Sequence, residues 1–136
     1  MSIGGKLMFK SYLNCNVYEA FQNRMKYIFN EFDNIYVSFS GGKDSGLLLN
    51  MVLDYVKNNN INKKIGVFHQ DFEAQYTVTT EYILKTFEDN LNYIEPYWVC
   101  LPMATRTALS SYEMYWYPWE IPKKNYGQDR CLINHM

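Results

Sequence analysis

Six consecutive residues have the side chains and backbone freedom that a phosphate- or sulfate-binding turn requires: Ser40, Gly41, Gly42, Lys43, Asp44 and Ser45. Glycine lets the backbone approach a bound oxyanion closely, and successive N–H groups in such a turn point at it. Lys43 adds a positive charge that could stabilise charge developing on a transferred group, and two serines add hydroxyl donors. The chemistry expected of this stretch is therefore the binding of an anionic group.

The flanking residues predict how this turn is positioned. A short apolar, β-branched and aromatic run at 35–39 indicates a strand, and an apolar run with helical spacing begins at Leu47. Strand, glycine turn and helix start then follow in order, and the helix dipole is positive at the turn. Two common phosphate-binding motifs do not fit, because Val37 stands where a Walker A loop needs glycine and no G-x-G-x-x-G is present.

The remaining chain predicts an α/β fold with a twisted parallel sheet flanked by helices. Helices are expected at 17–32, 44–57 and 77–90, and further strands at 64–69 and 97–101. Asn16 and Glu19 form a capping-box pattern before the first helix, which we expect to cover one face of the sheet. The apolar spacing predicts these buried side chains for the later two helices: Leu47, Leu48, Met51, Val52, Tyr55 and Val56, then Val78, Tyr82, Ile83 and Phe87, with Thr77 or Thr79 as cap.

Polar residues follow the later strands at the sheet edge where ligands of open parallel sheets bind. Asp71 and Glu73 could accept hydrogen bonds from ribose hydroxyls or an adenine amino group, and Arg106 suits a phosphate or sulfate. Magnesium held through water is a further possibility, with Asp44 and Asp71 as its carboxylates. His69 is interpreted as structural, since no second ligand histidine lies nearby. Three readings stay open for the aromatic cluster of residues 112–119: stacking on adenine, packing under a loop, or a partner surface.

Length and composition favour one globular domain, residues 1–136, with an arm at 1–15 and an aromatic, mildly basic segment at 103–136. The net charge of −1 argues against a generic nucleic-acid coat, and no apolar run is long enough for a membrane span. Three separated cysteines without a C-x-x-C pattern, and no visible signal peptide, fit a reducing cytoplasm. Cys100 lies between apolar neighbours and is expected in the core.

The turn and its context resemble the PP-loop of the adenine-nucleotide alpha-hydrolase superfamily. Five stretches resemble the phosphoadenosine phosphosulfate (PAPS) reductase-like branch related to immunoglobulin-binding regulator A: N-V-Y-E-A, V-S-F-S-G-G-K-D-S-G, D-F-E-A-Q-Y, W-V-C-L-P and S-x-x-x-x-x-W-x-x-W, starting at residues 16, 37, 71, 98 and 110. The resemblance implies a nucleotide-binding α/β fold that takes ATP or PAPS. The cofactor-binding residues that this reading gives are Ser38, Ser40, Gly41, Gly42, Lys43, Asp44, Ser45, Asp71, Glu73 and Arg106.

The chain departs from that family in two ways. The E-C-G-x-H motif that carries the catalytic cysteine of the assimilatory reductases is absent, and Cys131 with His135 is a weak substitute. Only three strands are evident where the family sheet has about five. We expect either that the chain is a short or truncated version of the family fold or that another subunit completes the sheet, and on the second alternative we expect a homo-oligomer or partner subunit. The function expected is sulfonucleotide reduction or ATP cleavage between the α and β phosphates; the alternative is a non-catalytic nucleotide-binding module.

Overall fold

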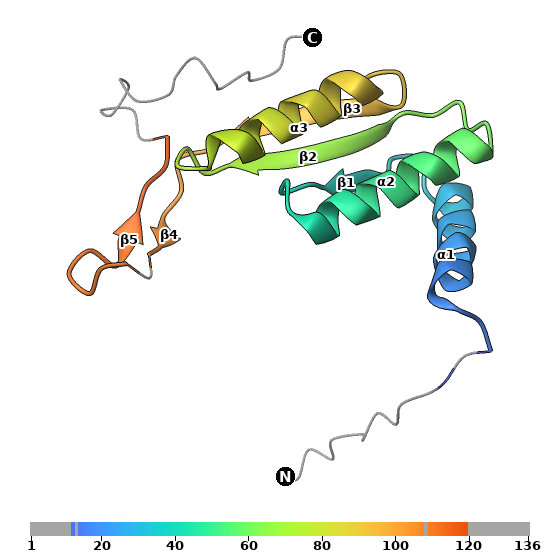
Figure 1. Cartoon of the computed structure of the whole chain (residues 1–136), viewed down its shortest axis with the longest axis horizontal. Helices are drawn as coiled ribbons and strands as arrows, with labels where there is room; N and C mark the ends of the chain where they lie inside the picture. Colours follow the sequence, from blue (N-terminus) through green and yellow to red (C-terminus); the bar gives the residue numbers. More distant parts are fainter. Residues whose placement is uncertain (1–11, 13, 108, 120–136) are drawn as a thin grey trace.

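Three parallel strands form the centre of the molecule, and two of its helices cover one face of them (Figure 1). The computed structural model describes residues 12, 14–107 and 109–119. In chain order the elements are α1 (Val17–Glu31), β1 (Tyr36–Ser38), α2 (Lys43–Asn58), β2 (Ile65–Asp71), α3 (Thr77–Asn90), β3 (Ile94–Cys100), β4 (Thr105–Arg106) and β5 (Tyr115–Trp116). This confirms the predicted α/β class, with a parallel sheet flanked by helices.

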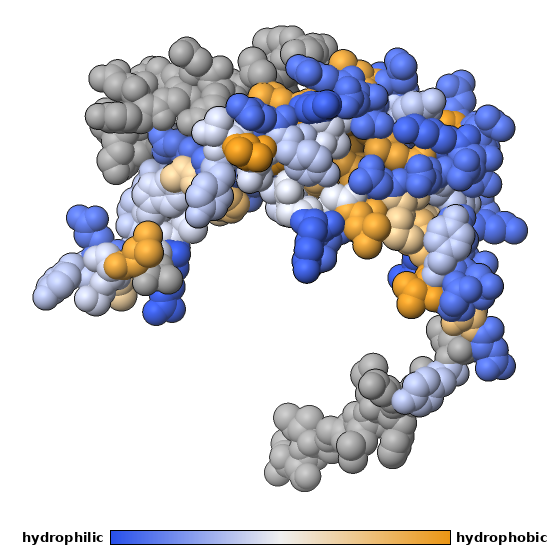
Figure 2. Space-filling view, viewed as in Figure 1, coloured by the Kyte–Doolittle hydropathy of each residue, from blue (hydrophilic) through white to orange (hydrophobic). Residues whose placement is uncertain are grey.

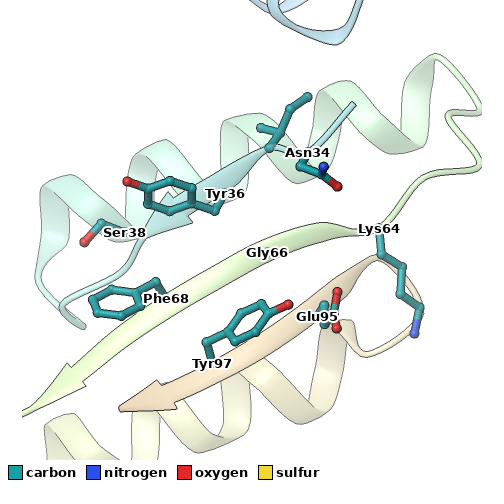
Figure 3. A pocket seen from close by; sticks show the side chains of 9 residues that line it. Asn34, Tyr36, Ser38, Lys64, Gly66, Phe68, Glu95 and Tyr97 are labelled. Carbon is teal, nitrogen blue, oxygen red and sulfur yellow. The ribbon is translucent and has the colours of Figure 1, made fainter. Parts of the chain in front are cut away.

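The strand order β1-β2-β3 explains why α2 and α3 lie on the same side of the sheet. β1 pairs in parallel with β2, with Val37 opposite Val67, and β2 pairs in parallel with β3 along all seven of its residues. Two successive right-handed crossovers that advance in one direction place both connecting helices on one face. Figure 3 shows the opposite face of the sheet, with the helices on the far side of the strands.

The hydrophobic core lies between this sheet face and the two helices. Alternate strand residues point into it, which is the two-residue period of a sheet with one covered face. Phe39 is at its centre: its ring packs edge-on against Tyr82 and tilted against Phe87, with ring centroids 5.8 and 6.3 Å apart. The principal buried strand residues are Val37, Ile65, Val67, Ile94 and Trp98, together with Cys100, whose predicted core position is confirmed.

The helices bury only part of the stripe that was expected: Val52, Tyr55, Val56, Ile83 and Phe87 are buried as predicted, and other predicted residues are not. Leu47 and Leu48 are exposed, and α2 turns Gly46, Leu49 and Leu53 inward beside Val52, Tyr55 and Val56. The reason is close helix packing, since a Cβ atom on Gly46 would lie 3.1 Å from the Tyr82 hydroxyl of α3. On α3, Val78 and Tyr82 are exposed and the buried residues are Thr80, Ile83 and Phe87. Its N-cap is Tyr76, with no side-chain cap, so neither Thr77 nor Thr79 has the predicted role.

The first helix has the predicted cap but a different position. The Asn16 side chain accepts from the Glu19 N–H at 2.9 Å, and the Glu19 carboxylate accepts from the Asn16 N–H at 3.1 Å, which completes the capping box. α1 then packs against α2, where Phe29 stacks on Tyr55 with ring centroids 5.4 Å apart. The expectation that this helix covers a sheet face is wrong, because its apolar stripe is used against α2.

The bounds of β2 and β3 also differ from the predictions. β2 continues to Asp71, and β3 begins at Ile94, three residues earlier than expected, and ends before Leu101. Pro96 does not exclude the earlier start, because β3 is at the sheet edge and proline is tolerated where no ladder N–H is needed.

Beyond β3 a short antiparallel hairpin, β4–β5, projects from the carboxyl end of the sheet (Figure 1). Its connection is rich in exposed apolar and aromatic side chains, among them Leu109, Met114 and Tyr112, which is 98% exposed (Figure 2). Trp119, by contrast, packs partly against the core. Among the described residues, no helix is long and apolar enough to cross a membrane. The predictions for residues 1–11 and for the tail, including Cys131 and His135, lie outside the described residues.

Candidate anion-binding site

The turn of residues 40–45, called the PP-loop here because of its sequence resemblance alone, connects the carboxyl end of β1 to the first turn of α2. The Phe39 N–H still donates to the Phe68 carbonyl of β2 at 2.8 Å, so the chain leaves the sheet only after Phe39. Gly41 then has φ of 78°, a left-handed conformation that favours glycine. Gly42 is the N-cap of α2 and provides no side-chain cap. The predicted strand–turn–helix arrangement is present.

Hydrogen bonds between the two serines close the loop on itself. The Ser45 hydroxyl donates to the Gly42 carbonyl at 3.1 Å and accepts from the Ser40 N–H at 3.3 Å. The two hydroxyl oxygens are 3.0 Å apart, and the Ser40 oxygen accepts from the Gly42 N–H at 3.3 Å. Both hydroxyls therefore stabilise the loop conformation, in addition to any role as donors to a ligand.

The electrostatics of the loop favour an anion at the start of α2. The first-turn N–H groups of a helix have no intrahelical acceptor, and Gly42 has no side chain to satisfy them. Lys43 and Asp44 are both exposed at this end, and neither forms an ion pair within the described residues. The lysine ammonium can reach an oxyanion bound to the N–H groups, while Asp44 itself complements the helix dipole.

Gly41 faces helix α3 on its other side. A Cβ atom built there would lie 2.8 Å from both the Thr79 methyl carbon and the Ile83 Cδ1, closer than real side-chain carbons approach. The loop is therefore seated directly on α3, and its backbone position is fixed by packing as well as by its own hydrogen bonds.

Asp71 is the point at which several segments meet. It is 3% exposed, and its carboxylate accepts from the Trp98 indole N–H at 3.0 Å and from the Glu73 backbone N–H at 2.7 Å. Its own carbonyl accepts from the Trp119 indole N–H at 2.8 Å. Both carboxylate oxygens thus have donors from the protein, as expected for a buried charged group.

Glu73 is tied to the same place and has φ of 66°. Its carboxylate accepts from the Trp119 backbone N–H at 3.0 Å. Asp71 and Glu73 together therefore anchor the residues after β5 to the end of β2. Within the described residues no group of three or more His, Cys, Asp or Glu side chains could hold a metal ion, so water-mediated magnesium binding by Asp44 or Asp71 stays a prediction.

The structure does not bring every predicted site residue to the loop. Ser38 is exposed on the sheet face opposite the helices, and Arg106 is exposed on β4, paired with Tyr115 of the hairpin. Within the described part of the chain, no hydrogen bond or ion pair joins Arg106 to the PP-loop. The group gathered around the loop is therefore Ser40 to Ser45 with α3 beneath it.

A hollow lies away from the loop, on the face of the sheet that no described helix covers (Figure 3). It has a volume of about 520 Å³, with Gly66 as its floor and Tyr36, Phe68 and Tyr97 around it. Tyr36 is 73% exposed. The Glu95 carboxylate accepts a hydrogen bond from the Tyr97 hydroxyl and raises the pKa of that tyrosine. Parallel sheets almost always have both faces covered, so this bare face is unusual.

Sequence reasoning missed three side chains that organise this end of the molecule: Gln75, Trp98 and Trp119. Their indole and amide N–H groups hydrogen-bond the ends of β2 and the segment after it. Trp98 and Trp119 were visible only as an alternating strand residue and a member of an aromatic cluster. Their hydrogen-bond partner, Asp71, is 27 residues from Trp98 and 48 residues from Trp119 in the sequence. No local sequence pattern predicts contacts over such separations.

Comparison with known proteins identifies one informative similarity. The chain is 39% identical over 114 residues to the uncharacterized protein YbdN of Escherichia coli K12, a match that covers 83% of this chain and 28% of that protein. The chain thus spans less than a third of the length of this relative. No protein-family model matches the chain, and no solved structure matches it.

Proposed function

We propose that this chain is a PP-loop protein of the PAPS reductase-like branch and binds an adenine nucleotide, ATP or PAPS, through Ser40–Ser45. The observation that carries the proposal is the loop itself: a glycine turn after a parallel strand, opening a helix whose N-cap has no side chain. Such a helix start is suited to phosphate or sulfate oxygens. Lys43 would neutralise the bound group, and the adenosine portion would extend along the carboxyl edge of the sheet.

The proposed reaction is sulfonucleotide reduction or cleavage of ATP between the α and β phosphates. In either case the first-turn N–H groups and Lys43 would stabilise negative charge on the departing phosphate or sulfur-bearing group. Asp71 and Glu73 would act indirectly on the nucleoside side, because their oxygens already accept protein N–H groups. Asp71 and Glu73 would fix the conformation of residues 72–76, which would contact the nucleoside.

A second candidate function, a non-catalytic nucleotide-binding module, is favoured by the cysteines. Reduction of a sulfonucleotide needs a thiol that can reach sulfur. Cys100 is buried on the helix-covered side of β3, and Cys15 precedes α1 at the opposite end of the strands from the loop. Neither described cysteine therefore offers a nucleophile at the PP-loop.

Calorimetry with one matched pair of variants tests the binding site. Lys43→Ala should weaken ATP or PAPS affinity by about 1.5–3 kcal/mol, the usual contribution of a hydrogen bond to a charged group. Lys26→Ala, which removes the same charge from an exposed position on α1, should leave the affinity unchanged. Equal affinities for both variants and the unsubstituted chain would show that the ligand binds elsewhere.

Turnover distinguishes the two candidate functions. The chain is incubated with ATP and Mg²⁺, and separately with PAPS and a dithiol reductant. AMP with pyrophosphate, or adenosine bisphosphate with sulfite, would identify the reaction. Binding without either product assigns this chain to the non-catalytic class.

We also propose that a further subunit, a second copy or another protein, completes the three-stranded sheet. Both β1 and β3 are edges within the described residues, and one sheet face is bare (Figure 3). Unpaired edges and uncovered parallel sheets are features that proteins normally protect.

A further inference from the structure

His69 is a buried polar side chain that the proposed binding chemistry does not use. It is 1% exposed and lies on β2 one strand away from the PP-loop. Its Nδ1 is 2.8 Å from the carbonyl oxygen of Phe39, the residue immediately before Ser40. A carbonyl can only accept, so Nδ1 carries the proton and donates.

This bond lies where β1 leaves the sheet. The Phe39 N–H is still held by β2, but its carbonyl is held by a side chain. Both backbone polar groups of Phe39, the last residue before the loop, are therefore hydrogen-bonded, its N–H to the backbone of β2 and its carbonyl to the imidazole. A shift of that carbonyl would move Ser40 and, through its bonds to Ser45 and Gly42, the whole turn.

The second ring nitrogen connects the imidazole to the segment after β2. With the proton on Nδ1, Nε2 is an acceptor, and the Gln75 amide nitrogen donates to it at 3.4 Å and to the Gln70 carbonyl at 3.3 Å. Trp98 packs edge-on against the ring, with centroids 4.6 Å apart. Burial lowers the pKa of His69, which keeps the imidazole neutral and this pattern of donors intact.

We propose that His69 is the positioning residue of the PP-loop, holding the Phe39 carbonyl so that the turn is preorganised for its oxyanion. Through Gln75 the same ring links the loop to the segment of residues 72–76, which follows β2 on the nucleoside side. The proposal rests on the proposed function, because it concerns the affinity of that site. It assigns no contact with ligand to His69.

Two substitutions of His69 distinguish a role in positioning the loop from a role in filling buried volume. In His69→Asn the amide nitrogen can take the place of Nδ1 and still donate to the Phe39 carbonyl, whereas in His69→Gln the amide reaches toward the place of Nε2. Both change the buried volume and polarity of the site. We expect His69→Asn to bind ATP or PAPS within about threefold of the unsubstituted chain. We expect His69→Gln to bind on the order of tenfold more weakly or worse, because preorganisation is lost.

Urea unfolding of both variants provides the control. The inference requires that their affinities differ while their midpoints of unfolding stay similar. Equal affinities, or a loss of affinity that simply follows a loss of stability, would overturn it. Lys43→Ala run alongside tests the proposed function separately: if it loses binding while His69→Gln does not, the site stands and the role of His69 is wrong.

The imidazole tautomer supplies a test that needs no substitution and no ligand. Long-range proton–nitrogen NMR of the unsubstituted chain near neutral pH should show His69 neutral with its proton on Nδ1. A proton on Nε2, or a charged ring, would remove the proposed bond and refute the inference even if nucleotide binds. If the spectrum shows the expected tautomer but no nucleotide binds, the hydrogen bond to Phe39 stands, whereas the proposed function fails and the role of His69 in affinity fails with it.

Discussion

Gly41→Ala should destabilise the fold far more than Gly42→Ala, although the two glycines are neighbours in one loop. Gly41 has a left-handed φ of 78°, which disfavours other L-residues by roughly 1–2 kcal/mol. Gly42 has φ of −79° with extended ψ, a conformation open to any residue. Both substitutions add one methyl group. The difference between their free energies of unfolding therefore reports the backbone conformation and packing at each position.

Packing against α3 adds a second penalty at Gly41. The new methyl carbon would meet Thr79 and Ile83 at 2.8 Å, and Ile83 is fully buried and cannot move aside without disturbing the core. Overpacking of this kind costs roughly 1–3 kcal/mol, so the total expected for Gly41→Ala is about 2–5 kcal/mol. At Gly42 the nearest atom, the Ser40 hydroxyl oxygen, is 3.4 Å away, and the expected effect is about 0.5–1 kcal/mol, because alanine is a poorer N-cap than glycine.

Urea unfolding followed by tryptophan fluorescence measures both variants. With an unfolding slope of about 1–3 kcal/mol per molar urea, Gly41→Ala should lower the midpoint by about 1 M or more, and Gly42→Ala by much less. Two variants within about 0.5 kcal/mol of each other would refute the reasoning, because the loop could not then be seated on α3 as described. In that case Gly41 would serve only the approach of a ligand.

Three further predictions concern the rest of the fold. Trp98→Phe leaves one buried oxygen of Asp71 without its donor and should lower the free energy of unfolding by about 1–3 kcal/mol or more, whereas Trp116→Phe on the hairpin should change it little; denaturant unfolding compares the two. Burial lowers the pKa of His69 below its ordinary 6.5, so on acidification the unfolded chain binds the proton before the folded chain does. Stability should therefore be full above pH 6.5 and decline as the pH falls below it. A midpoint temperature of unfolding that stays constant from about pH 7.5 to 5 would contradict this. Sedimentation should show self-association at micromolar concentration, weakened by Tyr36→Arg on the bare sheet face; a clean monomer of the unsubstituted chain would argue against a second copy completing the sheet.

Local patterns were sufficient for the parts of the fold that local physics decides. The capping box at Asn16 and Glu19, the turn at Gly41 and Gly42, and the bounds of α3 follow from spacing and residue type over a few positions. Parallel pairing of the strands was predicted from the βαβ pattern; once the strand order β1-β2-β3 is known, the shared side of α2 and α3 follows from the right-handed crossovers.

What could not be predicted depends on contacts between distant elements. Leu47 and Val78 have helical spacing that suits a buried stripe, but Gly46 lets α2 approach Tyr82 of α3 closely, and this closeness rotates both helices. Nor does the pattern after β2 reveal that Asp71 is buried under Trp98. From sequence alone, an acidic residue at this sheet edge is as consistent with a ligand contact as with a buried structural role. Only its hydrogen-bond donors distinguish the two.

The proposed function requires that an adenine nucleotide binds at the PP-loop. Titration of the nitrogen-15-labelled chain with ATP or PAPS, followed by amide NMR, tests it at every position at once. The largest shifts should fall on the amides of Ser40 to Ser45, with little change at Tyr36, Gly66 and Tyr97 on the bare face. Shifts concentrated on that bare face, with the loop unaffected at saturation, would contradict the central claim and move the ligand site to the opposite side of the sheet.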